Sequence, residues 1–347
     1  MSDIAAAATG VLQSVPSMLL FRRCEPVPDA AASEAMFRTD GLSHEGEAAG
    51  PRRRNIRRLC KWAGKILIVP VIGLAIALTN NNCSFPHTSR AEFDSRLDSA
   101  IERALRWLND HSVEAETNAS LMYMVTDMER LHGDARLRAT LDDFLTNPEI
   151  VNPLEPLDRV WPRMVHPEAT VPTIGQAALR GEGFEYRWDA YAIAPQQVLL
   201  SDEDRAAMFS PTQHRWGIRD DQLLALVMYR HFNGSSDTLD RTINHLSEKV
   251  ALTAHWDIRV TDFYIQRSAF VLAAGRPDLV RRRWIERILE YQLPDGSWNP
   301  CWHGWCRSVF DFDFNGRRLH DHPTVQAAWA LYMLKYKYSS WIAQHYR

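Results

Sequence analysis

The sequence lacks the alternation of apolar and polar residues that marks β-strands, and no strand pattern of any length is present in its 347 residues. It also lacks an excess of positive charge, because 40 Lys and Arg stand against 43 Asp and Glu to give a net charge of −3. That balance argues against nucleic-acid binding by the chain as a whole. These two absences favour an all-α protein that binds no nucleic acid.

Cysteine is scarce, and its arrangement does not match a zinc site. The five cysteines include the pair in Cys301-Trp-His303-Gly-Trp-Cys306, whose spacing fits no standard zinc pattern and lacks a second ligand pair. We therefore expect no metal and no cofactor. If this region lies in an oxidising compartment, a local disulfide between Cys301 and Cys306 is the expected pairing.

Long uncharged apolar runs are rare, and the longest one follows a basic block. Seven cations lie between Arg52 and Lys65, and the run from Ile66 to Leu78 carries no charge. Counted from Trp62 to Thr79, the apolar segment reaches about 18 residues, the lower limit for a transmembrane helix. No cation follows until Arg90, so the positive-inside rule places the N-terminal side in the cytoplasm. A cleaved signal peptide and a buried core helix are the two alternatives.

The domain organisation follows from this anchor. We predict a disordered cytoplasmic tail at 1–50, a basic juxtamembrane segment at 51–65, a single-pass transmembrane helix at 66–79 and a linker at 80–92. Residues 93–347 form an extracytoplasmic domain, so the chain is expected in the cell membrane with its C-terminal domain outside the cytoplasm. Cys83 then lies in an oxidising compartment.

The outer domain shows helical periodicity throughout except in one proline-rich stretch. A capping box at Ser89-x-x-Glu92 opens a helix with Phe93, Leu97 and Ile101 on one face. Further helices are predicted at about 118–132, 134–146, 202–208, 220–232, 237–250, 260–274, 278–292 and 322–337. Prolines between 148 and 172 break the pattern, so 147–200 is predicted to be irregular. The polar and aromatic residues in this stretch either form a lid or a second wall of the cavity, or are ordinary loop residues: His166, Glu168, Glu185, Tyr186, Trp188 and Asp189.

A weak internal repeat indicates stacked helical hairpins. Gln222, Gln266 and Gln326 each head a nearly all-apolar helix, at spacings of 44 and 60 residues. Amphipathic helices at 239–250 and 279–291 lie between them. Fully apolar helices belong inside and striped helices outside. Periods of this length with alternating helices indicate a helical-hairpin array, either a solenoid or a closed toroid.

The segment Gln292-Leu-Pro-Asp-Gly-Ser-Trp298, followed by the helix that starts near His320-Asp-His322, resembles a known repeat unit. It is similar to the helical hairpin of the terpenoid cyclase and protein prenyltransferase superfamily, over about residues 236–340. The resemblance implies an incomplete (α/α) toroid in which Gln292 and Trp298 tie one hairpin to the next. The Asp-rich motifs of those enzymes are absent, and Asp311-Phe-Asp313 is the nearest string. Their activities are therefore not carried over.

In a toroid the inner helices point their N-terminal ends at one cavity, where partial positive charge favours anionic groups. The repeat makes Asp221, Asp262 and His322 equivalent positions. We predict Asp262 as a general base and His322 as an acid or an orienting group. Two further acids, Asp257 and Asp321, complete the predicted catalytic set. The predicted ligand-binding residues are Asp221, Trp256, Tyr264, Trp298 and His320. Helix capping explains the same acidic and imidazole groups without a ligand.

These observations predict a membrane-anchored extracytoplasmic domain that holds a ligand in its central cavity. If the domain is catalytic, the aromatic content favours a glycan-type substrate, and an apolar small molecule is the other ligand class. The alternative is a non-catalytic assembly module that binds a protein partner on its concave surface. A third hypothesis is isoprenoid processing without the usual Asp-rich motif. Paired carboxylates with displaced pKa values would favour catalysis.

Overall fold

The computed structural model describes residues 23–24, 72–84, 88–111, 119–147, 156–212, 216–298 and 321–346. Over these residues the regular secondary structure is helical, apart from one pair of two-residue strands and one isolated bridge. The all-α prediction is confirmed for this part. The longer helices are α2 (Arg90–Asp110), α3 (Ala119–Leu131), α4 (Ala135–Thr146), α7 (Phe184–Ile193), α9 (Trp216–Asn233), α10 (Asp237–Trp256), α11 (Asp262–Ala273) and α13 (Asp321–Tyr332).

Shorter elements connect them. These are η1 (Pro156–Val160), α6 (Pro162–Val165), α8 (Asp202–Phe209), η2 (Pro277–Leu279), α12 (Arg282–Glu290), the π-helical turn η3 (Met333–Lys337) and α14 (Ser339–His345). Helix α2 starts as the capping motif predicts, because the Ser89 hydroxyl accepts a hydrogen bond from the Glu92 backbone N–H at 3.2 Å. Its predicted apolar face, including Phe93, Leu97 and Ile101, is buried.

Two helix predictions need correction. The stretch 147–200 is not wholly irregular, because η1, α6 and α7 lie in it. Helix α9 begins at Trp216, four residues before the predicted start at 220. Asp220 and Asp221 therefore lie within a helix instead of at its cap position.

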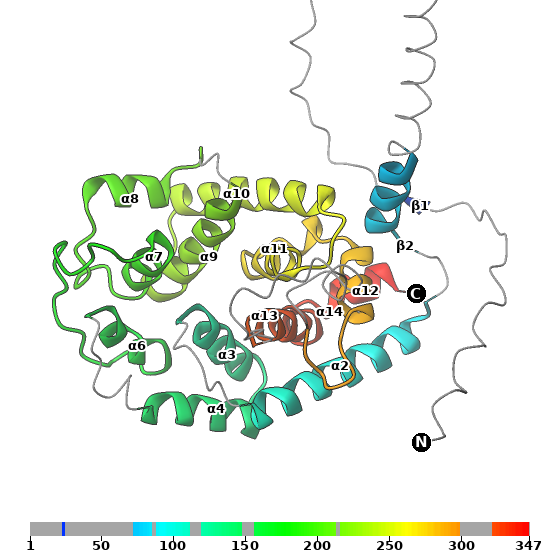
Figure 1. Cartoon of the computed structure of the whole chain (residues 1–347), viewed down its shortest axis with the longest axis horizontal. Helices are drawn as coiled ribbons and strands as arrows, with labels where there is room; N and C mark the ends of the chain where they lie inside the picture. The colour runs from blue at the N-terminus through cyan, green and yellow to red at the C-terminus, as the bar shows by residue number, and fades with distance from the viewer. Residues whose placement is uncertain are drawn as a thin grey trace, which may run out of the picture.

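Five helices form the inside of the domain. Helix α7 contacts α9, α9 contacts α11, α11 contacts α13, α13 contacts α3, and α3 contacts α7, so the order of contacts closes on itself. In Figure 1, α11 and α13 are seen nearly end-on near the centre, and α2, α4 and α10 lie at the periphery. The helices that carry the repeated Gln residues, α9, α11 and α13, were predicted to lie inside, and all three belong to this inner set.

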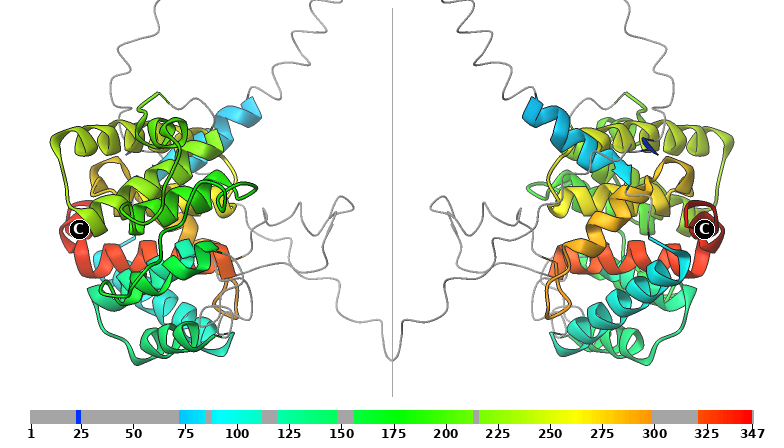
Figure 2. Two further views of the ribbon diagram at one scale, coloured as in Figure 1. Left: turned by 90° about the vertical axis from the view of Figure 1, so that its left-hand side faces the viewer. Right: turned by 90° about the vertical axis from the view of Figure 1, so that its right-hand side faces the viewer.

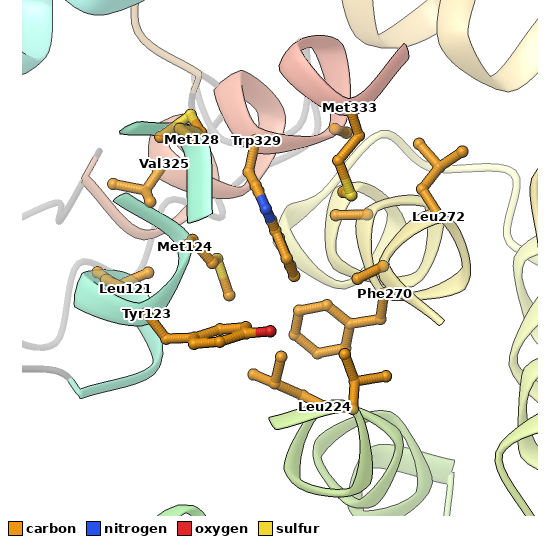
Figure 3. Packing of buried hydrophobic residues seen from close by; sticks show 14 of the residues in the cluster. Leu121, Tyr123, Met124, Met128, Leu224, Phe270, Leu272, Val325, Trp329 and Met333 are labelled. Carbon is orange, nitrogen blue, oxygen red and sulfur yellow. The ribbon is translucent and has the colours of Figure 1, made fainter. Parts of the chain in front are cut away.

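Side chains fill the space between the inner helices. Tyr123 of α3, Phe270 of α11 and Trp329 of α13 meet with Leu224 of α9 in Figure 3. The ring centroids of Tyr123 and Trp329 are 5.9 Å apart, and those of Phe270 and Trp329 are 6.3 Å apart. At this level the expected central cavity is occupied by buried aromatic and aliphatic residues. Polar groups that could meet a ligand lie nearer the helix ends.

The turn after α12 connects two hairpins as the sequence resemblance implies. The Gln292 side-chain amide donates to the backbone oxygens of Ala100 and Gly296, each at 2.9 Å. The Trp298 indole N–H donates to the Ile288 oxygen at 2.8 Å. The Trp298 backbone N–H donates to the Thr324 hydroxyl at 2.9 Å. Gln292 thus ties the turn to α2, and Trp298 ties it to α12 and α13.

Residues 72–82 are helical and join the domain by their last turn. The Asn81 amide donates to the backbone oxygens of Ala254 and His255, both at 3.1 Å, at the end of α10. The Arg283 guanidinium donates to the Asn80 backbone oxygen at 2.9 Å. The first residues of the predicted linker are therefore held against α10 and α12. Figure 2 shows this helix extending away from the body of the domain.

No helix in the described ranges is both long and apolar enough to cross a membrane. The predicted span 66–79 is described only from residue 72 onward. The exposed residues of this helix include Ile72, Leu74 and Ile76.

A short strand pair joins two distant parts of the chain. β1 (Arg23–Cys24) runs antiparallel to β2 (Cys83–Ser84), with Cys24 opposite Cys83, and Cys83 is disulfide-bonded. The disulfide agrees with an oxidising compartment for Cys83. A single membrane crossing between residues 24 and 83 would place the two strands on opposite sides of the membrane, so the predicted single-pass topology requires this pair to be separated in the membrane-inserted protein. Cys301 and Cys306 lie outside the described residues, and their predicted disulfide stays a prediction.

Candidate functional site

The N-terminal turns of α11 and α13 meet through a carboxylate and an imidazole. His322 Nδ1 lies 3.0 Å from Asp262 Oδ1 and 2.9 Å from Asp262 Oδ2. Both side chains are partly exposed. The two predicted catalytic residues thus lie in direct contact at one end of the inner helices.

Asp221 of α9 lies at the same end. The Gln266 amide, one turn into α11 from Asp262, donates to Asp221 Oδ1 at 3.1 Å. His322 is also close enough to act electrostatically on Asp221. The repeat alignment predicted that Asp221, Asp262 and His322 would converge, and the structure brings all three together.

Helix α7 adds two carboxylates, Glu185 and Asp189. The sequence did not decide whether these residues belong to a lid or wall of the site or to an ordinary loop. Asp189 is buried and accepts a hydrogen bond from the Ser120 hydroxyl at 2.5 Å. Glu185 lies one turn earlier in the same helix, and both acids interact electrostatically with Asp221. The site therefore draws on α3, α7, α9, α11 and α13.

Burial and mutual repulsion raise the pKa values of these acids. Desolvation, reinforced by Asp221 and Glu185, raises the pKa of Asp189 to about 7. Desolvation, reinforced by Asp220 and Glu185, raises the pKa of Asp221 to about 7, although Gln266 and His322 oppose the shift. At neutral pH each of these carboxyls is therefore divided between its protonated and ionised forms.

Asp220 and Asp257 belong to a buried ion-pair chain beside the site. Arg267 Nε donates to Asp220 Oδ2 at 2.9 Å, and Arg267 Nη1 donates to Asp257 Oδ2 at 2.8 Å. Desolvation raises the pKa of Asp220 to about 6, against the attraction of Arg267. Asp257 also accepts from the Arg259 backbone N–H at 3.2 Å. These contacts assign Asp257, predicted as catalytic, to holding Arg267 in place.

Gln326, one turn into α13, extends the polar group inward. Its Nε2 lies 3.2 Å from His322 Nε2. Gln326 is 0% exposed, and its Oε1 has no hydrogen-bond partner among the described residues. Gln222, the corresponding residue of α9, makes different contacts, because its Nε2 donates to backbone oxygens at the end of α8, including Met208 O at 2.8 Å.

The capping explanation does not account for the two central acids. Asp262 is the first residue of α11, and the preceding cap residue, Thr261, makes no side-chain capping bond. Asp221 lies more than one turn inside α9. Their described hydrogen-bond partners are the side chains of His322 and Gln266. The geometry therefore favours a shared polar site over separate helix caps.

The three aromatic residues predicted to bind a ligand do not present a ring to the Asp262–His322 site. Tyr264 and Trp298 are fully buried, and the guanidinium of Arg287 lies 5.2 Å from the Tyr264 ring centroid. Such rings have no face for a ligand, so both are packing residues. Trp256 is 59% exposed at the end of α10, next to the Asn81 contacts and outside the Asp262–His322 group.

Two exposed aromatic residues adjoin the acids: Phe263, which was missed as a binding candidate, and Tyr186, which the sequence left open between a lid or wall and an ordinary loop residue. Phe263 follows Asp262, Tyr186 follows Glu185, and both side chains are exposed. Phe263 also packs against Arg267, whose guanidinium lies 5.6 Å from the ring centroid. His320 lies outside the described residues, and so does the side chain of Asp321.

A signal for α7 was available in the sequence. The ten residues from Phe184 to Ile193 contain no Pro or Gly, and Phe184 and Trp188 have helical spacing. The surrounding prolines outweighed this short pattern. Within the described part of the chain, no group of three or more His, Cys, Asp and Glu side chains is arranged to hold a metal ion.

Comparison with known proteins gives no identification: no family model, no curated protein and no solved structure matches this chain.

Proposed function

We propose that this domain is an acid–base enzyme acting on a glycan-type substrate at the N-terminal ends of its inner helices. The observation that carries the proposal is the contact of Asp262 with His322 beside Asp221. A carboxylate held by an imidazole, next to a second carboxyl that retains its proton near neutral pH, supplies the two groups that acid–base catalysis requires.

The proposed roles follow from the partners of each group. His322 Nδ1 contacts both oxygens of the Asp262 carboxylate and holds it in place, so we assign Asp262 as the general base. Asp221 is the general acid, because desolvation and neighbouring carboxylates raise its pKa to about 7. In hydrolysis, Asp221 would give its proton to the glycosidic oxygen as that bond breaks. Asp262 would take a proton from the water whose oxygen bonds to the sugar carbon.

The aromatic residues support the choice of a glycan. The exposed rings of Phe263 and Tyr186 lie next to Asp262 and Glu185 in sequence. A flat apolar ring beside hydrogen-bonding carboxylates suits a sugar, which has an apolar ring face and polar edges.

Isoprenoid processing is less well supported. Four carboxyl groups already lie near the N-terminal ends of the inner helices, where a diphosphate would bind: Glu185, Asp189, Asp221 and Asp262. These carboxylates would repel the diphosphate of an isoprenoid substrate. The nearest buried cation, Arg267, is already paired with Asp220 and Asp257.

A non-catalytic assembly module is the second candidate. Leu252 and Trp256 are four residues apart on α10, and both are exposed. Exposed large apolar residues on one helix face suit a protein partner. This face lies beside the helix 72–82, so binding there would leave Asp262 and His322 unaffected.

For the architecture we propose an incomplete (α/α) toroid behind a membrane anchor at 66–79. The closed order of contacts among α3, α7, α9, α11 and α13 supports the toroid, as do the Gln292 and Trp298 ties. Exposed Ile72, Leu74 and Ile76 support an apolar environment around the start of the described helix.

The test is depolymerisation of a glycan panel by the full-length protein, followed as new reducing ends. Asp221→Asn, Asp262→Asn and His322→Gln should each lower the rate at least about 100-fold with an unchanged melting temperature. Asp202→Asn is the matched control, because Asp202 is 95% exposed on α8. Equal rates for the site variants and the wild type, or no glycan cleaved at all, would overturn the proposal.

A further inference from the structure

The acidic end of the inner helices is rich in hydrogen-bond acceptors. Glu185, Asp189, Asp220, Asp221 and Asp262 interact electrostatically with one another or share partners there. The cations of this region are engaged: Arg267 is paired with Asp220 and Asp257, and His322 contacts Asp262. Arg219 acts electrostatically on Asp220. A ligand entering this group meets mainly carboxylate oxygens.

Two buried acceptor atoms point independently to the same ligand chemistry. Within the part of the chain that the structure describes, Gln326 Oε1 has no partner although the side chain is 0% exposed, and the Gln326 amide nitrogen contacts His322. Asp220 Oδ1 likewise has no partner among these residues, in a side chain that is 1% exposed and next to Asp221 in sequence. Buried acceptors without partners are costly, and a ligand that brings hydrogen-bond donors removes that cost.

We propose that the substrate of this site carries protonated amino groups, as an amino sugar or a polyamine-like chain does. An ammonium group offers three donors and no acceptor, and it neutralises carboxylates that otherwise repel one another. A neutral polyol supplies donors but no charge. The inference rests on the proposed glycan-directed function, which it narrows to amine-bearing glycans.

The charge of the site predicts how such binding depends on pH. Asp221 interacts electrostatically with Asp220 on α9, with Glu185 and Asp189 on α7 and with His322 on α13, and it accepts a hydrogen bond from Gln266 on α11. Arg219 acts on the neighbouring Asp220, and Asp262 contacts His322. Below neutral pH, Asp189 and Asp221 bind protons that compete with a cationic ligand. Affinity for a probe that stays charged should therefore rise as the pH increases through about 7.

Calorimetric titration of the full-length protein tests the proposal with three probes. They are a tetramer of glucosamine, the same tetramer fully N-acetylated, and spermidine. At low salt and about pH 6, where a glucosamine amine is still largely protonated, the free-amine tetramer should bind at least about tenfold more tightly than the acetylated one. Added salt should reduce this difference. Spermidine affinity should rise between about pH 6 and 8.

Variants tie the effect to the site. Asp221→Asn should remove the preference for the free amine, whereas Asp202→Asn on the exposed face of α8 should keep it. Asp262→Asn is the second variant, used if Asp221→Asn does not fold, and it should have the same effect.

The outcomes separate this proposal from the wider one. Equal affinity for both tetramers, with glycan cleavage intact, overturns the amine preference and leaves the glycan function standing. Spermidine binding that is lost in Asp221→Asn, without binding of either tetramer, supports the cation site and overturns the glycan function. Failure of all three probes to bind overturns the inference.

Discussion

Single carboxyl groups carry the main energetic cost of this site. Asp189 is buried, with Ser120 as its hydroxyl donor and with Asp221 and Glu185 as electrostatic neighbours. Its pKa is about 7 in the folded protein, against about 3.9 in an unfolded chain. A carboxyl group whose pKa is raised by folding contributes its full stabilisation below its pKa in the unfolded chain. That contribution is lost as the pH rises through its pKa in the folded protein. The relevant window is therefore about pH 4 to 7.

Asp189→Asn should stabilise the protein above this window. The amide keeps the oxygen that accepts from Ser120 and cannot ionise. At pH 8 the variant should exceed the wild type by roughly 2–4 kcal/mol in free energy of unfolding, and the gain should vanish near pH 4. Denaturant titrations at both pH values measure it. A gain that is the same at pH 4 and pH 8 would show that ionisation of Asp189 is not its source.

At the scale of the elements, the turn between α12 and α13 depends on one backbone conformation. Gly296 has φ of 100°, and a Cβ atom there would lie 2.3 Å from the Arg103 backbone oxygen. The close approach lets Gln292 bond to both Ala100 and Gly296. The hairpin connection therefore requires glycine at this position for space as well as for its dihedral angle.

Gly296→Ala should lower the free energy of unfolding by about 3 kcal/mol or more. Gly234 provides the control, since it has φ of 86° but no atom within 4 Å of the added Cβ. Gly234→Ala should cost only about 1 kcal/mol, the left-handed strain alone. Urea unfolding of the two variants gives the comparison, and equal losses would remove the steric explanation.

The last turn of the helix 72–82 should be as firmly attached as the domain core. Asn81 is buried, donates to the end of α10 and accepts a hydrogen bond from Arg287. Asn81→Ala leaves those buried groups without partners and should cost about 2–3 kcal/mol. Asn109→Ala, at an exposed bond on α2, should change stability by less than about 0.5 kcal/mol. A small loss for Asn81→Ala, measured by thermal unfolding, would mean that this turn is loosely held.

The sequence predicted these elements unevenly, for physical reasons. The long amphipathic helix α2 and the start of α10 were placed well, because their buried faces repeat over several turns, whereas α10 continues to Trp256, six residues beyond its predicted end. The turn from Gln292 to Trp298 was found because Pro and Gly restrict the backbone there. Helix α7 was missed, since ten residues hold little periodic signal between proline-rich flanks.

The candidate site was predicted in part. Helical register alone placed Asp221, Asp262 and His322 at equivalent positions, and they converge. The buried state of Tyr264 and Trp298 depends on packing between helices far apart in the sequence, which periodicity does not reveal. The sequence left the role of Asp189 open, and its place beside Asp221 follows from the packing of α7 against α9.

At the scale of the whole molecule, the membrane arrangement is predicted from the apolar segment at 66–79 and the basic block before it. The predicted single pass separates residues 1–61 from 80–347, so it requires the β1–β2 pair to be separated in the membrane-inserted protein. We expect carbonate-resistant membrane association through the apolar segment, with the domain outside the cytoplasm. A C-terminal reporter that works only in the cytoplasm tests the orientation, and activity of that reporter would contradict it.

The most direct test of the central claim is hydrogen–deuterium exchange of the full-length protein with and without a bound oligosaccharide. If one site lies at the converging helix ends, the ligand should slow exchange in the first turns of α7, α9, α11 and α13, around Glu185, Asp221, Asp262 and His322. Asp221→Asn should reduce that protection, and Asp202→Asn should not. Protection confined to the Leu252–Trp256 face of α10, or spread evenly over the domain, would contradict the account.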